Sequence, residues 1–390
     1  MRREVLLPTA DRRLEPYRVG QREPVTPPAG ADPPRSRVAY AAAHVVADPW
    51  ADADPVGDTC IDWDATLAFR RHLWSAGLGV AEAMDTAQRG MGLDWHAARE
   101  LIRRTATEAA HERGELVCGV TTDQLPADRP ADLDAVRAAY IEQLEAVEHA
   151  GARAVIMASR HLAAAATSSD DYLQLYGILL EQVSRPVILH WLGDMFDPAL
   201  AGYWGHREPK AAADVVVALC ADHADAIDGV KVSLLDARFE VALRDRLPAG
   251  VRCYTGDDFH YPQLIEGDAS GHSDALLGIF DPIAPVAATA LRALDDGAVD
   301  VYRALLAPTV PLAQQVFAAP TYHYKTGVVF LAYLNGHQDH FRMVGGRESA
   351  RSVVHLAELF RRADQAGVLA DPETAVGRLR PVLALAGVDG

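Results

Sequence analysis

The sequence predicts an α/β barrel of eight parallel strands and alternating helices, followed by a helical C-terminal extension. Eight short β-prone segments recur along residues 37–285, and amphipathic helical segments lie between most of them. Such alternation is typical of βαβ units, which assemble a parallel sheet. The chain has 390 residues. Because a plain (β/α)8 TIM barrel needs roughly 250 residues, this length leaves room for extensions.

The strands are expected where short apolar runs are bounded by polar or turn-forming residues. They are predicted at residues 37–46, 78–84, 116–122, 152–159, 186–192, 227–233, 251–258 and 273–280. Helices are predicted where apolar residues recur near helical spacing, at residues 61–77, 95–112, 132–151, 170–184 and 211–225. Acidic residues begin the segment 170–184 and Gly151 follows an earlier one, as expected at helix termini.

The two ends of the chain differ from the barrel region. Residues 1–36 are rich in proline and arginine and predict an extended N-terminal arm, because each proline removes a donor and restricts its predecessor. Residues 286–390 read as further helices packed on the barrel, not as an independent domain. We therefore expect an arm at 1–36, a barrel at 37–285 and a helical extension at 286–390.

Composition and charge narrow the classes of function. The net charge of −17 gives no basic footprint for nucleic acid or for an anionic membrane surface. No apolar run approaches the length of about 18 residues that spans a bilayer, so a cytoplasmic location is expected. The four cysteines are far apart in sequence and form no CxxC pair, which favours free thiols over a zinc knuckle.

Lysine is rare in this chain. Of 37 basic residues only Lys210, Lys231 and Lys325 are lysines, and arginine cannot replace lysine where a neutral amine must attack a carbonyl group. Lys231 falls in the sixth predicted strand, and functional residues of such barrels gather at the C-terminal ends of the strands. Burial there would lower its pKa. We predict that Lys231 forms a Schiff base; the alternative is a structural lysine paired with a buried carboxylate.

Other polar residues lie in or just after predicted strands. His190 in the fifth strand is a candidate proton carrier or a core histidine. Asp257 and Asp258 end the seventh strand, where they would bind substrate hydroxyls, hold a metal, or have a cap or loop role before the next helix. Asp281 ends the eighth strand and has the same alternatives.

Two further segments supply candidates for the mouth of the barrel. Glu82 and Asp85 lie close to the tip of the second strand, in a segment too polar for a barrel core. Arg160 follows the fourth strand and is a candidate clamp for a carboxylate or another anion of the substrate, with a surface ion pair as the alternative.

Several segments resemble the dihydrodipicolinate synthase and N-acetylneuraminate lyase superfamily of class I aldolases. DGVKVS is similar to the sixth-strand segment that carries the Schiff-base lysine, YTGDD to the seventh-strand segment, and ALLGIFDPIAP, with Gly278, to the eighth. YHYKTGVVFLAYLNG resembles the C-terminal helix, which gives Lys325 a structural role. The resemblance extends over approximately residues 37–340. It implies a cofactor-free lyase without a metal, assembled as a homo-oligomer, either a dimer or a tetramer.

The sequence departs from that superfamily at two sites. PVILHWLG places His190 where typical members have a proton-relaying tyrosine. GLGVAEAMD stands in place of the Gly-Thr-Thr-Gly-Glu signature that holds the substrate carboxylate. The resemblance therefore implies amine catalysis in an outlying branch, without the usual carboxylate pocket.

Three functions stay open. The main prediction is a lyase of the aldolase or dehydratase type that acts through Lys231 on a small carbonyl substrate such as a keto acid or keto sugar. His190 would carry the proton, and the substrate would be bound by Arg160, Glu82, Asp85, Asp257, Asp258, Gly278 and Asp281. The alternatives are a metal-dependent isomerase or aldolase using His190, Asp257, Asp258 and His260, and a non-catalytic barrel that binds a ligand.

Overall fold

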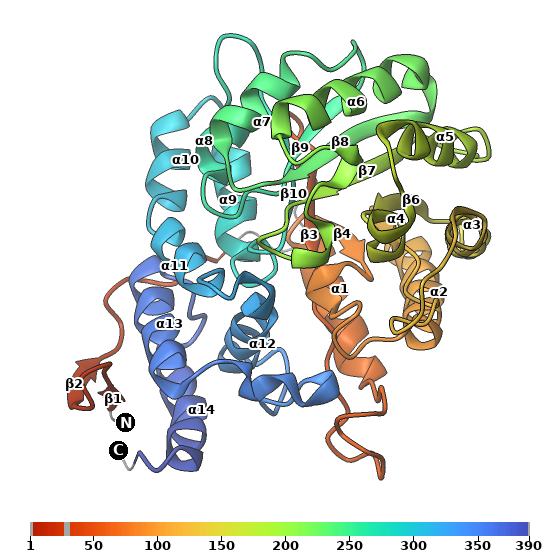
Figure 1. Cartoon of the computed structure of the whole chain (residues 1–390). Helices are drawn as coiled ribbons and strands as arrows, with labels where there is room; N and C mark the ends of the chain where they lie inside the picture. Colours follow the sequence, from red (N-terminus) through yellow and green to blue (C-terminus); the bar gives the residue numbers. More distant parts are fainter. Residues whose placement is uncertain (1–2, 27–31, 389–390) are drawn as a thin grey trace.

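The computed structural model describes residues 3–26 and 32–388, and its centre is a closed barrel of eight parallel strands (Figure 1). In chain order the strands are β3 (Ala39–Ala42), β4 (Gly79–Glu82), β5 (Leu116–Val120), β6 (Arg153–Met157), β7 (Val187–Leu192), β8 (Ile227–Ser233), β9 (Arg252–Thr255) and β10 (Asp274–Leu277). Each predicted strand segment contains one of them, and β10 pairs with β3 to close the ring. The predicted TIM barrel with extra C-terminal helices is confirmed.

Helices follow the strands around the outside of the barrel. They are α1 (Trp63–Ser75), α2 (Trp95–Glu112), α3 (Leu133–His149), α4 (Arg160–Ala165), α5 (Ser169–Leu180), α6 (Pro209–Asp222), α7 (Ala237–Arg244) and α8 (Tyr261–Glu266). The side chains of Asp62, Asp94 and Asp132 cap the first three of these helices by accepting backbone N–H bonds. The prediction missed α4, α7 and α8, because helices of six to eight residues show too little of the helical period.

The interior of the barrel is a small apolar cluster that includes Ile188 and Tyr254. Because side chains alternate along a strand, His190 and Leu192 on β7 face the same side as Ile188. Lys231 lies opposite His190 in the β7–β8 register and opposite Tyr254 in the β8–β9 register. The lysine therefore points into the barrel, between two neighbouring strands.

The C-terminal helices cover one side of the barrel (Figure 1). They are α9 (Ala284–Asp295), α10 (Val299–Leu306), α11 (Thr309–Val316), α12 (Tyr324–Leu334), α13 (Val353–Ala366) and α14 (Pro372–Leu385). Every residue of α12 is buried, and α12 contacts both its helical neighbours and the short 3-10 helix η1 (Asp85–Ala87) that follows β4. The extension thus reaches the C-terminal ends of the barrel strands.

The N-terminal segment, predicted to be an extended arm, contains an antiparallel hairpin of β1 (Glu4–Pro8) and β2 (Leu14–Arg18). The hairpin packs on α13 and α14, so the first and last described elements of the chain lie side by side (Figure 1). The hydroxyl of Tyr17 donates to Asp364 on α13 over 2.7 Å. Among the described residues, no helix is both long enough and apolar enough to cross a membrane.

Candidate active site

A small pocket at the C-terminal ends of the strands contains Lys231. Ser233 lies two residues further along β8 and lines the pocket beside the lysine. The remaining lining residues come from the C-terminal ends of β3 and β7, from the segments that follow β4, β7, β9 and β10, and from the C-terminal extension: Ala42, Met84, Asp85, Thr86, Leu192, Phe196, Asp258, Gly278 and Tyr324. Catalytic groups of (β/α)8 enzymes lie at this end of the barrel.

Lys231 is buried and forms no ion pair within the described residues. Its side chain is only 7% exposed. Among the described residues, no carboxylate oxygen lies within 4.0 Å of its Nζ atom. No other group in these residues forms a hydrogen bond with Nζ. Burial lowers the pKa of Lys231, while the charges of Asp85 and Asp258 partly oppose the shift. The environment therefore favours the neutral amine, which is the nucleophilic form.

Asp258 faces the same pocket from the loop after β9. Its Oδ1 atom accepts a hydrogen bond of 2.9 Å from the backbone N–H of Ile279. Burial raises the pKa of Asp258 to about 7, although the nearby charge of Lys231 acts in the opposite direction. A carboxyl group with this pKa can give or take a proton near neutral pH.

His190 is completely buried and lies behind the pocket wall, not in it. Its Nε2 atom is 3.1 Å from the hydroxyl of Ser233, and its Nδ1 atom has no partner in the described part of the chain. Burial, reinforced by the charge of Lys231, holds the pKa of His190 well below its usual value. The imidazole is therefore neutral and reaches the pocket only through Ser233.

Ser233 was not among the predicted site residues, although its position relative to Lys231 indicates a place in the site. Ser233 lies two residues after Lys231 on the same strand, so both side chains point to the same side of the sheet. It is 2% exposed and lines the pocket. The serine thus connects the buried histidine with the space next to the lysine.

Gly256 and Gly278 leave the space that the pocket needs. A Cβ atom on Gly256 would lie 2.1 Å from Oγ of Ser233 and 2.9 Å from Cε of Lys231. A Cβ atom on Gly278 would lie 3.1 Å from the ring of Phe317 and 3.2 Å from that of Tyr324. Any side chain at position 256 would therefore displace the lysine.

A larger cleft adjoins the lysine pocket. The pocket has a volume of about 10 Å³, whereas the cleft has about 590 Å³, which is in the usual range for small-molecule sites. Asp85, Leu192 and Phe196 line both spaces. A substrate would therefore occupy the cleft and reach toward Lys231.

Four of the predicted binding residues lie together at this end of the barrel. Asp258 and Gly278 line the lysine pocket, Arg160 lines the cleft, and Asp85 lines both. Arg160 also forms an ion pair of 2.5 Å with Asp197.

Glu82 does not reach the pocket, contrary to its predicted role. Both of its carboxylate oxygens are 2.8 Å from the guanidinium group of Arg70, and both side chains are fully buried. The hydroxyl of Thr105 and the backbone N–H of Ala83 also donate to Glu82. The carboxylate of Glu82 thus joins β4 to α1 and α2 and does not contact the pocket.

Asp257 and Asp281 also point away from Lys231. Asp257 accepts hydrogen bonds from the backbone N–H groups of Phe259 and His260, in the turn before α8, and lies 2.8 Å from Nδ1 of His260, so its hydrogen bonds hold this loop. Asp281 is buried, and its Oδ2 atom lies 2.8 Å from Nδ1 of His44. Neither aspartate lines the lysine pocket.

The four candidates for a metal site do not form one group. His190 bonds to Ser233, Asp257 bonds to His260, and Asp258 faces the lysine pocket. Within residues 3–26 and 32–388, no cluster of three or more histidine, cysteine, aspartate or glutamate side chains is arranged to hold a metal ion.

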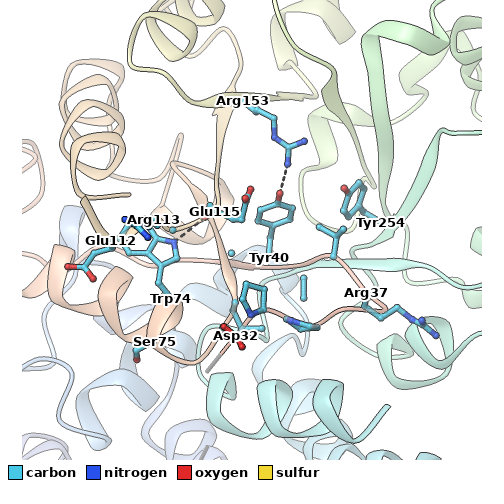
Figure 2. A pocket seen from close by; sticks show the side chains of 18 of the residues that line it. Asp32, Arg37, Tyr40, Trp74, Ser75, Glu112, Arg113, Glu115, Arg153 and Tyr254 are labelled. Carbon is cyan, nitrogen blue, oxygen red and sulfur yellow. Dashed lines mark hydrogen bonds between the residues drawn. The ribbon is translucent and has the colours of Figure 1, made fainter. Parts of the chain in front are cut away.

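Another cavity of about 660 Å³ opens at the opposite end of the barrel, and Figure 2 shows its lining. Arg153 at the start of β6 bonds to the hydroxyl of Tyr40 there, and Tyr254 lies beside them (Figure 2). These residues come from the N-terminal ends of the strands, where conservation and chemistry in this fold serve stability rather than catalysis. The candidate active site is therefore the lysine pocket with its cleft.

A comparison with protein families matches residues 5–388 to a family described as "Protein of unknown function (DUF993)". The chain belongs to this family. No curated protein matches the chain.

Solved structures show that the chain is a distant structural relative of dihydrodipicolinate synthase. The enzyme from Thermotoga maritima aligns with a TM-score of 0.63 at 14% identity, over 86% of this chain and 100% of its own. The enzyme from Acinetobacter baumannii, solved with pyruvate, gives 0.61 at 15% identity, over 86% and 100%. The enzyme from Aquifex aeolicus gives 0.60 at 13%, over 90% and 98%. Identities this low establish the shared fold alone.

Proposed function

We propose that this protein is a lyase that forms a Schiff base between Lys231 and a small keto compound. The observation that carries the proposal is a buried lysine at the C-terminal end of a barrel strand, without a carboxylate partner in the described residues and next to a cleft of about 590 Å³. A purely structural lysine would be expected to pair with a buried carboxylate.

The first step joins the neutral amine of Lys231 to the carbonyl carbon of the substrate. One proton of the amine and one from the carboxyl group of Asp258 go to the carbonyl oxygen, which leaves as water. The products are a protonated imine on Lys231 and an ionised Asp258. The pKa of Asp258, about 7, suits this transfer at neutral pH.

The second step uses the imine as an electron sink. When a bond to the carbon next to the imine breaks, its electron pair moves toward the nitrogen and an enamine forms. The carboxylate of Asp258, or Ser233 backed by His190, would take the proton released in this step. This assigns Asp258 the proton transfer that sequence reasoning gave to His190.

Borohydride trapping read by intact-protein mass tests the proposal. The panel contains 2-keto acids, beginning with pyruvate because one structural relative was solved with it, and keto sugars. We expect a reduced adduct on the wild type and on Lys210→Arg, which changes an exposed lysine, but not on Lys231→Arg. The mass increase identifies the class of keto compound, and peptide mapping locates it.

Two results would count against the proposal. An adduct that persists in Lys231→Arg would show that another amine reacts. Absence of any adduct over the whole panel, with the wild type folded, would remove the support for imine chemistry.

A further inference from the structure

We propose that the cleft beside the lysine pocket binds a phosphate group at the far end of the substrate, through Lys325 together with Arg160 and Arg347. The inference rests on the proposed function for the carbonyl end of the substrate. It adds a substrate class, a phosphorylated keto compound, and gives Lys325 a binding role in place of the structural role that the sequence resemblance implied.

Lys325 is a second buried lysine that forms no ion pair with any residue the structure describes. It lies in the first turn of α12, is 6% exposed and lines the cleft. Its Nζ atom contacts the sulfur of Met91 and the carbonyl oxygen of Tyr322, both at 3.3 Å. No carboxylate in the described part of the chain lies within 4.0 Å of it. Buried charges are normally paired, so a buried cation without an ion pair in the described ranges leaves a place for an anionic ligand.

Two arginines line the same cleft with donors to spare. Arg160 uses only Nε for its ion pair with Asp197, which leaves both terminal nitrogens without a partner among the described residues. Arg347 is exposed and forms no ion pair within the described ranges. A guanidinium group with free terminal nitrogens matches the oxygens of a phosphate or a carboxylate.

The balance of charge in the cleft favours an anion. Its lining contains four cations, Arg89, Arg160, Lys325 and Arg347, and three carboxylates, Asp85, Asp123 and Asp197. Asp123 is paired with Arg89, and Asp197 with Arg160. The chain as a whole carries a net charge of −17. A positive cleft on such an acidic protein would attract anionic ligands selectively.

Asp85 links the two lysine sites. It lines both the pocket and the cleft, and its charge acts on both Lys231 and Lys325. The two sites therefore lie within reach of a single small molecule, whose carbonyl group would meet Lys231 while its other end meets Lys325. Three cations around that end fit the double charge of a phosphate ester better than the single charge of a carboxylate.

Calorimetric titration with inorganic phosphate at constant ionic strength tests the site without any reaction at Lys231. We expect the wild type to bind phosphate, and Lys325→Met and Arg160→Gln to bind it at least about tenfold more weakly, as for the loss of a charged hydrogen bond. Lys210→Met is the matched control, because it makes the same change on the exposed surface. Equal affinity of all four proteins, or no binding to the wild type up to about 10 mM phosphate, overturns the inference.

Trapping with three keto compounds then identifies the anion. Dihydroxyacetone phosphate, 2-oxoglutarate and dihydroxyacetone are compared by the concentration that gives half-maximal adduct on Lys231. We expect the phosphate ester to need the lowest concentration on the wild type and to lose this advantage in Lys325→Met. If 2-oxoglutarate has the advantage instead, the assignment of phosphate is wrong.

The two experiments separate this inference from the proposed function. If adducts form equally well with charged and neutral compounds and phosphate does not bind, the Schiff base at Lys231 is supported and the anion site is contradicted. Phosphate binding that depends on Lys325, without any adduct on Lys231, supports the anion site and contradicts the imine chemistry.

Discussion

Burial at the C-terminal end of the barrel favours the neutral forms of both Lys231 and Asp258. It lowers the pKa of Lys231 and raises the pKa of Asp258 to about 7, because a low-dielectric site disfavours both charged forms. Each charge also stabilises the other, and this opposes both shifts. A neutral amine next to a neutral carboxylic acid is the combination that imine formation requires.

The exchange Asp258→Asn tests this arrangement. Imine formation needs the amine deprotonated and Asp258 protonated, so the wild-type rate should rise with pH as Lys231 loses its proton and decline at higher pH as Asp258 loses its own. In Asp258→Asn we expect the rate to drop by about 10²–10⁴, as for loss of a general acid, and this decline with pH to disappear. The measurement is the initial rate of borohydride-trapped adduct between pH 5 and 9. An unchanged profile would assign the proton transfer to another group.

The absence of a side chain at Gly256 leaves room for Ser233 and Lys231. In Gly256→Ala the new methyl group would overlap with Ser233 and Lys231. We expect the free energy of unfolding to fall by about 1–3 kcal/mol from overpacking, and adduct formation to be lost. Gly377→Ala is the control, because nothing lies within 4 Å of a Cβ atom there. Urea denaturation and trapping measure both effects; full trapping by Gly256→Ala contradicts the described pocket.

The buried charge of Lys325 should lower the stability of the folded protein. Burial lowers the pKa of this lysine to about 8 from an ordinary value of 10.5. Below pH 8 it is charged in both the folded and the unfolded state, and the folded state bears the full penalty. As the pH rises from 8 to 10.5 the folded protein loses the proton first, so the penalty declines.

We therefore expect Lys325→Met to raise the free energy of unfolding at pH 7 by about 1–3 kcal/mol, because it removes an unpaired buried charge. The gain should shrink toward pH 10. Urea denaturation at the two pH values measures it, with Lys210→Met as the surface control. A variant that is less stable than the wild type at pH 7 would favour the structural role of Lys325.

At the scale of elements, the buried pair of Arg70 and Glu82 joins α1 to the end of β4, and Thr105 connects α2 to the same carboxylate. Such a pair is costly to break because the remaining charge stays buried. The pair thus fixes the strand that precedes η1, and η1 carries Asp85 to the border between pocket and cleft.

For Glu82→Gln we expect a loss of about 3–5 kcal/mol in the free energy of unfolding, since Arg70 loses its buried partner. The concentration for half-maximal trapping should stay close to that of the wild type under conditions where the variant is folded. For Asp85→Asn we expect the opposite result: the free energy of unfolding should change little, whereas the concentration of keto compound for half-maximal trapping should change. If Glu82→Gln instead changes substrate binding without loss of stability, the predicted substrate-binding role of Glu82 is restored.

Helix α12 is the element that connects the extension with the site. The hydroxyl groups of Tyr324 and Thr86 are 2.9 Å apart, and the ring of Tyr324 stacks on Phe317. Tyr324 thereby closes the lysine pocket while its neighbour Lys325 enters the cleft. The extension therefore contributes directly to the candidate site.

At the scale of the whole molecule, the N-terminal hairpin holds the C-terminal helices. The buried carboxylate of Asp364 on α13 accepts hydrogen bonds from Tyr17 and from the backbone N–H groups of Gly20 and Gln21. Val5, Leu7 and Val19 are buried in the main core. The first and last segments of the chain are thus packed together.

Deletion of residues 1–21 should therefore destabilise the protein by several kcal/mol, because it exposes core side chains to water and removes the hydrogen-bond donors of Asp364. Thermal unfolding measures the change. The milder variant Tyr17→Phe removes one hydrogen bond to a charged group and should cost about 1–3 kcal/mol. An unchanged melting temperature after the deletion would mean that the hairpin contributes nothing to the stability of the fold.

Local patterns in the sequence were sufficient for the strands, the longer helices and the lysine. Alternation of apolar strands and amphipathic helices is a local property, and it predicted all eight strands. The rarity of lysine and the position of Lys231 in an apolar strand indicated the same buried residue that the structure describes. Short elements such as α4, and the N-terminal hairpin, escaped because few residues or many prolines weaken those patterns.

Only the tertiary structure decided which polar side chains meet. Asp257 and Asp258 are neighbours in sequence, yet one bonds to the backbone of the turn before α8 and the other faces the pocket of Lys231. Glu82 forms its ion pair with Arg70, twelve residues earlier in the chain. Ser233 forms a hydrogen bond with His190 on the adjacent strand, and this contact connects the histidine with the pocket. Tyr324 and Lys325 reach the site from more than ninety positions after Lys231. Periodicity along a chain reflects how each segment meets water and the core, whereas contacts across such separations depend on how the segments pack.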